Sequence, residues 1–196
     1  MDKDFEDTDA KMREEVLNQV EKLIKTTEAK KNWPTMSDTQ KEAFLQKVLD
    51  IQCAEMKKKI PNFAVPKITT FSKAAQKVKE DKLTNESGYF RDGKLYINDQ
   101  KASFKDFADV INTVIHENTH NYQDQLVGML ERGELENDPR KNQAILFRLN
   151  QDEYQDTPKR DNYKGDYDEA FEAYEKQPRE LHAMRAGNDA KARFKG

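Results

Sequence analysis

A long amphipathic segment from Ser103 to about Val127 sets the strongest limit on the architecture of this protein. Apolar residues recur in it at helical spacing, namely Phe104, Phe107, Val110, Ile111, Val114 and Ile115. Ser103 is a suitable N-cap, Asp106 suits the first turn, and no proline or glycine interrupts the segment. The pattern predicts a helix whose wide apolar face must be covered by the rest of the chain.

The same segment contains His116-Glu117-Asn118-Thr119-His120, an H-E-x-x-H sequence. Residues four apart lie on one face of a helix, so both imidazoles can reach a single zinc ion. Glu117 would contact a water molecule at the metal rather than the metal itself. Because zinc lowers the pKa of that water toward about 7, a neighbouring carboxylate can take its proton as general base. The motif predicts zinc-dependent hydrolysis with Glu117 as the base, and the alternative is two ordinary histidines on a helix.

A catalytic zinc site needs a third protein ligand, which must come from elsewhere in the chain. Downstream, Pro178 suits the first turn of a helix that contains Glu180 and His182, the one remaining histidine. Glu180 and Ala183 are three apart and share a face, and the small Ala183 would let this helix approach the zinc helix closely. We favour Glu180 as the third ligand. His182 is the alternative, and an ordinary capping glutamate is the remaining interpretation.

Residues 114–123, joined to Tyr174-x-x-Gln177-Pro178-x-Glu180-x-x-Ala183, resemble the zincin-like metallopeptidases of the gluzincin type. The resemblance is strongest to small bacterial and phage-type peptidases in which H-E-x-x-H is followed by a Pro-x-Glu-x-x-Ala element, and it covers about residues 64–190. No Gly-x-x-His extension follows His120, so the three-histidine metzincin pattern is absent. The resemblance implies a small mixed sheet packed on the zinc helix. An edge strand, expected at Lys94–Asn98, would line the cleft and bind a peptide as an extra antiparallel strand.

The resemblance also implies how such a site would act. Zinc would polarise the scissile carbonyl, while Glu117 would activate water and later protonate the leaving amine. A further donor should stabilise the oxyanion, and the candidates are Tyr174, Tyr163 and His182. Gln123 and Asp124, which follow His120, could orient the ligands, but we expect both to face solvent.

The rest of the sequence predicts an α+β protein that is mainly helical with a small mixed sheet. Residues 8–30 and a segment opened by a capping box at Ser37 and Gln40 predict two helices. A strand is predicted at residues 67–71, and Asp92-Gly93 predicts a hairpin. Further helices are expected at residues 140–150 and around Pro178, with Gly187 as the end of the last one. We expect an N-terminal helical pair in residues 1–60 and a zincin-like metallopeptidase domain in residues 61–196.

The composition excludes several classes of protein. Charged residues make up 36% of the chain, but 34 basic and 37 acidic residues nearly cancel, which favours a folded protein over a disordered one. No apolar run approaches the length of a membrane span, and the N-terminus does not resemble a conventional signal peptide. A single cysteine, Cys53, fits a reducing compartment. We expect a cytoplasmic protein, or one exported by another route as an effector or toxin.

The sequence therefore predicts a soluble zinc-dependent metallopeptidase that acts on proteins or peptides. The pI of 5.8 argues against a dedicated nucleic-acid binder, and nothing predicts a membrane partner. The alternative function is a zinc-containing binding or interaction module that keeps the fold without turnover. A structural zinc site is a third hypothesis, which requires a fourth ligand such as His182.

Overall fold

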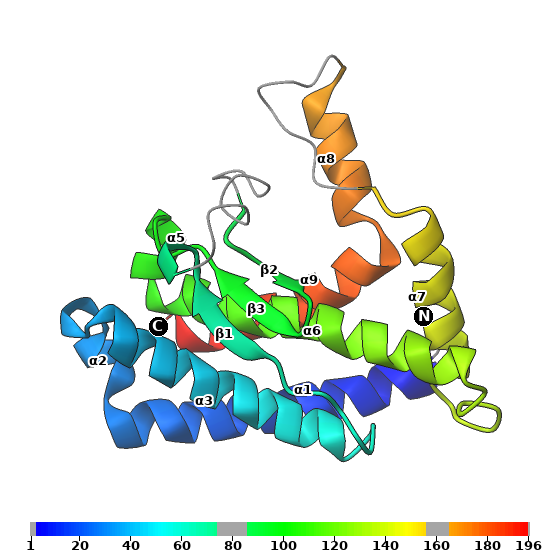
Figure 1. The fold of residues 1–196 in the computed structure, drawn as a ribbon, viewed down its shortest axis with the longest axis horizontal. Helices are drawn as coiled ribbons and strands as arrows, with labels where there is room; N and C mark the ends of the chain where they lie inside the picture. Colours follow the sequence, from blue (N-terminus) through cyan, green and yellow to red (C-terminus); the bar gives the residue numbers. More distant parts are fainter. Residues whose placement is uncertain (1–2, 74–85, 156–164, 196) are drawn as a thin grey trace.

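The computed structural model describes residues 3–73, 86–155 and 165–195 of the chain. Within these residues the protein is mostly helical and contains one small mixed sheet, which confirms the predicted α+β class (Figure 1). None of the described helices is long and apolar enough to cross a membrane. In chain order the elements are α1 (Lys3–Thr27), α2 (Ala29–Asn32), the 3-10 helix η1 (Trp33–Thr35), α3 (Asp38–Lys57), β1 (Lys67–Thr70), the 3-10 helix η2 (Phe71–Lys73), β2 (Gly88–Arg91), β3 (Lys94–Ile97), α5 (Ala102–Lys105), α6 (Phe107–Glu131), α7 (Lys141–Asp152), α8 (Tyr167–Glu175) and α9 (Pro178–Phe194).

The sheet has the strand order β1-β3-β2, with β1 parallel and β2 antiparallel to β3. Asp92 and Gly93 form the predicted hairpin turn, with positive φ angles of 50° and 70°. β3 is the central strand, so the prediction that Lys94–Asn98 forms the edge of the sheet is wrong. The reason is that β1, which is distant in sequence, pairs with the other side of β3 and leaves β2 as an edge strand.

Helix α6 is the predicted long helix, but it begins later than expected. Asp106 is the N-cap, and its side chain accepts a hydrogen bond from the backbone N–H of Asp109 at 3.0 Å. Ser103 instead lies inside the short helix α5, and the two helices are separated by the extended backbone of Asp106. The prediction that Ser103 caps the long helix is therefore wrong, because a carboxylate three residues later provides the cap.

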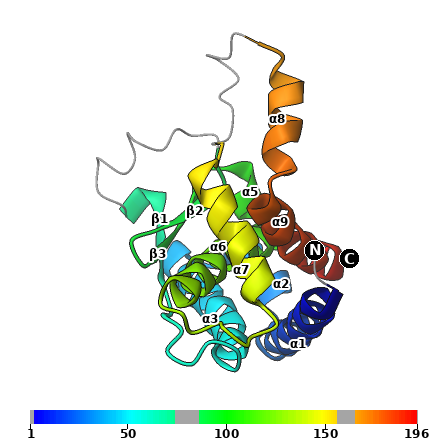
Figure 2. The same cartoon turned by 90° about the vertical axis from the view of Figure 1, so that its right-hand side faces the viewer.

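The N-terminal helices pack against the centre of the molecule. α3 opens with the predicted capping box, in which the N–H of Gln40 donates to Ser37 Oγ and the N–H of Ser37 donates to Gln40 Oε1, at 3.3 and 2.8 Å. α3 packs against α6 and β1, and α1 packs against α3 and α9. Figure 1 and Figure 2 place α1 and α3 on one side of the molecule and α8 on the other. Buried apolar residues of α1, α3, α6 and α9 belong to one hydrophobic cluster.

Helix α9 lies close to α6 because four of its buried residues are small, namely Ala183, Ala186, Gly187 and Ala190. A Cβ atom at Gly187 would lie 2.3 Å from Oδ1 and 3.2 Å from the backbone oxygen of Asn112 on α6. The helix continues through Gly187 to Phe194, so the expectation that this glycine ends the helix is wrong. The glycine marks a close contact between two helices, and that contact brings Glu180 to α6.

Candidate metal centre

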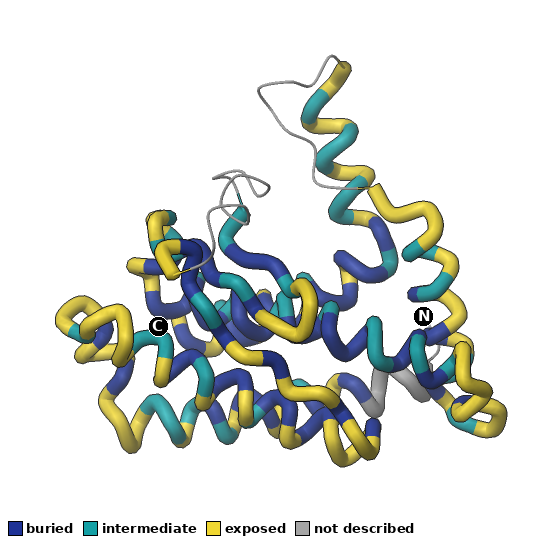
Figure 3. The backbone as a smooth tube through the Cα atoms, in the orientation of Figure 1, coloured by how far each residue is buried: buried dark blue, intermediate teal, exposed yellow. Residues whose placement is uncertain are grey.

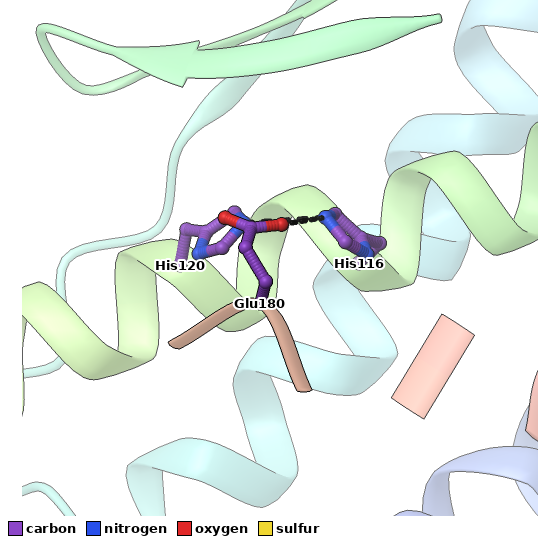
Figure 4. A group of neighbouring side chains, drawn as sticks. All are labelled: His116, His120 and Glu180. Carbon is purple, nitrogen blue, oxygen red and sulfur yellow. Dashed lines mark hydrogen bonds and ion pairs between the residues drawn. The ribbon is translucent and has the colours of Figure 1, made fainter. Parts of the chain in front are cut away.

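Three side chains predicted as ligands meet between α6 and α9. His116 and His120 lie one turn apart on α6, and Glu180 points toward them from the first turn of α9 (Figure 4). The two Nε2 atoms of the histidines are 3.2 Å apart. Glu180 Oε1 lies 3.3 Å from His120 Nε2, and Glu180 Oε2 lies 3.6 Å from His116 Nε2. In the part of the chain that the structure describes, no fourth histidine, cysteine or carboxylate joins this group.

These separations fit a tetrahedral metal ion. Zinc–nitrogen and zinc–oxygen bonds of about 2.0–2.1 Å place the ligand atoms of a tetrahedron about 3.3–3.4 Å apart. The observed distances of 3.2, 3.3 and 3.6 Å lie around that value. Glu180 is only 1% exposed, and its Oε2 atom has no hydrogen-bond partner among the described residues. A buried carboxylate oxygen without a donor is costly, and a cation between the three ligands would satisfy it.

The electrostatics of the cluster favour the metal-binding forms of His120 and Glu180, but not that of His116. Burial and the neighbouring His116 lower the pKa of His120 to about 4, so its imidazole is neutral at pH 7. Burial would raise the pKa of Glu180, but its contacts with His116, His120 and Tyr154 lower that pKa to about 2. Burial would lower the pKa of His116, but its contact with Glu180 and the charge of Glu117 outweigh that effect and raise it. Metal binding should therefore displace a proton mainly from His116.

Gln123 holds the imidazole of His120 in the tautomer that a metal requires. Its side-chain amide is fully buried and makes all four hydrogen bonds available to a primary amide. The NH2 group donates to the backbone oxygen of Arg179 at 2.9 Å and to Nδ1 of His182 at 3.0 Å. Its oxygen accepts from Arg179 Nε at 3.0 Å and lies 3.0 Å from His120 Nδ1. Because the oxygen can only accept, His120 carries its proton on Nδ1 and leaves Nε2 free for a metal.

The expectation that Gln123 faces solvent is therefore wrong. Its position three residues after His120 places it on the ligand face of the helix, which is a signal that the sequence contains. Asp124 is partly exposed, as expected, and accepts a hydrogen bond from Arg179 at 2.5 Å. The partners of Gln123 come from α9, which lies more than fifty residues away in sequence, and no local pattern predicts that contact.

Tyr154 is a site residue that the sequence did not reveal. Its hydroxyl donates to Glu180 Oε1 at 2.6 Å. Burial and the nearby Glu180 raise the pKa of Tyr154 far above its ordinary value, so the hydroxyl stays protonated and remains a donor. Tyr154 lies just after α7 in a polar segment without periodicity, which is why no pattern predicted a role for it.

Two members of the cluster, His116 and His120, line an open cleft with a volume of about 420 Å³. His116, Glu117 and His120 line one wall, and residues 88–90 of β2 line another. Gly88 allows this edge strand to lie close to α6, because a Cβ atom there would be 2.8 Å from Thr113 Cγ2. Side chains of Tyr154, Phe171 and Tyr174 also line the cleft, the last two from α8, which projects outward and has no buried residue (Figure 3).

The other predicted site residues fall in different places. Glu117 is half-buried on the cleft wall, and Tyr174 lies on the cleft with its ring 6.4 Å from that of Tyr154. His182 does not line this cleft: it is 2% exposed, and its Nε2 atom lies 3.3 Å from Asp9 Oδ2 on α1. Tyr163 lies outside the described residues.

Comparisons of the chain with protein-family models, with curated protein sequences and with solved structures gave no match. The chemistry that the site can perform therefore follows from its own residues. Those residues supply two imidazole nitrogens and one carboxylate, a set typical of zinc sites that keep one position open for water.

Proposed function

We propose that this protein is a zinc-dependent metallopeptidase. The observation that carries the proposal is the group of His116, His120 and Glu180, which has tetrahedral spacing and whose two histidines line an open cleft. Catalytic zinc sites have three protein ligands, whereas structural sites have four. Because His182 lies beside Asp9 instead of completing the group, the arrangement favours a catalytic site.

Each residue of the cleft has a role in this proposal. A zinc ion bound here would supply a Lewis acid that polarises the scissile carbonyl and lowers the pKa of water. Glu117 would take the proton from the attacking water and deliver it to the leaving amine. Tyr174 is our candidate donor to the oxyanion, and we do not assign that role to His182 because it does not line the cleft.

The edge strand β2 is the proposed binding surface for the substrate backbone. It pairs only with β3 among the described strands, and it borders the same cleft as the ligands. An extended peptide could add to β2 by main-chain hydrogen bonds, which are independent of side-chain identity. Such an enzyme would act on protein or peptide substrates in the cytoplasm, or in a compartment reached without a conventional signal peptide.

The proposal is tested by Glu117→Gln, which keeps the shape of the side chain but removes the base. We expect about one zinc per chain in both proteins by elemental analysis, and a loss of hydrolysis of about 100-fold or more in the variant. New N-termini in a proteome digest give the readout. Glu131→Gln is the matched control, because it changes an exposed residue of the same helix outside the cleft. Equal cleavage by wild type and Glu117→Gln would refute the proposed mechanism.

The same experiment distinguishes the alternative function. If the wild-type protein binds zinc through His116, His120 and Glu180 but cleaves nothing, the binding or interaction module is supported instead. If no zinc binds, both functions are refuted.

A further inference from the structure

We propose that helix α1 is part of the metal centre, because Asp9 acts through His182 and Gln123 to fix the proton positions that free Nε2 of His120 for the metal. This inference rests on the metal site of the proposed function. It gives the N-terminal helix a role in the site, with Asp9 as a positioning residue that does not touch metal or substrate.

A continuous series of polar contacts joins α1 to the ligand. Asp9 Oδ2 lies 3.3 Å from His182 Nε2, and both side chains are buried, at 5% and 2% exposure. His182 Nδ1 lies 3.0 Å from Gln123 Nε2, and Gln123 Oε1 lies 3.0 Å from His120 Nδ1. The series runs from Asp9 on α1 through His182 on α9 to Gln123 and His120 on α6. It therefore connects three helices through buried or half-buried side chains.

The proton position at each contact follows from the chemistry of the neighbouring groups. A carboxylate only accepts, so Asp9 requires the proton of His182 on Nε2. The lone pair on His182 Nδ1 then accepts from the amide NH2 of Gln123. That leaves the amide oxygen to accept from His120 Nδ1, and the lone pair of His120 Nε2 points to the metal position. Reversing one bond would set two donors or two lone pairs against each other.

Asp9 is suited to start this series. Burial alone would raise the pKa of Asp9, but His182 and Arg13 lower it below its ordinary value, so the carboxylate is ionised at neutral pH. Arg13 donates to the same Oδ2 atom and also to Asp189 of α9 at 3.0 Å, which holds α1 in place. Without Asp9, His182 could carry its proton on Nδ1, where it would face the donor of Gln123 and displace the amide.

The test is the affinity of the full chain for Zn²⁺, measured by competition with a chromophoric chelator and supported by the visible spectrum of the Co²⁺ form. We expect Asp9→Ala to weaken Zn²⁺ binding about tenfold, the low end for partners of metal ligands, because Asp9 acts through two side chains. Asp9→Asn should restore affinity to within about threefold of wild type, because its amide oxygen still accepts from His182.

Glu55→Ala is the matched control. Glu55 is a buried carboxylate, 5% exposed, that ties α3 to α1 by accepting from Gln19 at 2.7 Å. Its other described partner is Lys58, which does not belong to the series. A variant that only loosens α1 should lower the thermal stability without changing Zn²⁺ affinity. We expect that result for Glu55→Ala, and a loss of both for Asp9→Ala.

A double-mutant cycle decides whether Asp9 acts through Gln123. In a Gln123→Leu background, which weakens binding by itself, Asp9→Ala should cause no further loss of affinity. The inference is overturned if Asp9→Ala binds Zn²⁺ as tightly as wild type, or if it causes the same loss in both backgrounds. These outcomes are independent of hydrolysis. If the wild-type protein binds zinc tightly but cleaves nothing, the proposed peptidase is contradicted and the affinity test still applies. If the wild-type protein binds no zinc, both proposals are overturned.

Discussion

Substituting Gly187 tests whether the contact between α9 and α6 is as close as the structure shows. In a helix interior, Gly→Ala normally stabilises by about 1 kcal/mol through helix propensity. Here the new Cβ atom would lie 2.3 Å from Oδ1, 3.1 Å from Cγ and 3.2 Å from the backbone oxygen of Asn112. The side chain of Asn112 can rotate away, since within the described parts of the chain it makes just one long hydrogen bond, of 3.4 Å to Asn188. The backbone oxygen cannot move in this way.

The two effects can be compared in magnitude. Overpacking costs about 1–3 kcal/mol, which exceeds the gain in propensity, so Gly187→Ala should lower the free energy of unfolding by about 0–2 kcal/mol. Asn112→Ala removes Oδ1 and Cγ but leaves the backbone oxygen at 3.2 Å. In that background Gly187→Ala should be neutral or slightly stabilising, which corresponds to a coupling of about 1–2 kcal/mol.

Urea denaturation of the four proteins measures this coupling. Gly187→Ala should also weaken zinc binding, because a shift of α9 away from α6 displaces Glu180, which lies two turns earlier on the same helix. If Gly187→Ala alone is more stable than wild type by the full gain in helix propensity and its zinc affinity is unchanged, the two helices do not meet as closely as described.

Three further predictions concern the metal, the buried carboxylate of α1 and the thiol. Zinc at one hundred times its dissociation constant should stabilise the fold by about 2.7 kcal/mol, or about 5–11 °C in Tm for a chain of this length, and Glu180→Ala should abolish the shift seen by differential scanning fluorimetry. Because the pKa of Asp9 is lowered in the folded protein, its contribution to stability is present above the unfolded pKa near 3.8 and is lost as the pH falls. Denaturation between pH 5 and pH 3 should therefore show a smaller loss of stability for Asp9→Asn than for wild type. Burial raises the pKa of Cys53 to about 12, so a thiol reagent at pH 8 should label it only at the rate at which the protein unfolds.

Local patterns predicted the parts of the fold that depend on neighbouring residues. The spacing of His116 and His120 placed both imidazoles on one face, the Asp92-Gly93 pair placed the hairpin, and Ser37 placed the start of α3. The errors arose where a distant segment decides the outcome. β3 is central because β1 pairs with it, and Gly187 is helical because α6 packs against it.

The candidate site shows the same division. Glu180 was predictable because a helix start and the small Ala183 are local features. Gln123 was expected to face solvent because a polar side chain is normally exposed unless distant partners satisfy it, and those partners lie on α9. Tyr154 belongs to no periodic segment, so only its contact with Glu180 identifies it.

The low apolar content of the chain acquires a physical explanation from the residues around the motif. Hydrophobic residues make up only 35% of the sequence, and several buried polar side chains flank the H-E-x-x-H turn. Gln52 of α3 donates to Thr119 at 3.3 Å and to the backbone oxygen of Ile115 at 3.1 Å, and it accepts from Asn118 at 3.0 Å. On the other flank, Gln123 joins the same helix to α9.

The two central residues of the motif are thus fixed to α3, while the second histidine is fixed from α9. Such hydrogen bonds fix the rotation of a helix about its axis and its position along the neighbouring helix. Apolar packing alone defines both less sharply. A site that must hold three ligand atoms at tetrahedral spacing needs that precision, because a metal binds strongly only where its ligands are preorganised. Several of the buried polar residues therefore surround the candidate metal site, and under the proposed function zinc binding should add stability to a core that contains few apolar residues.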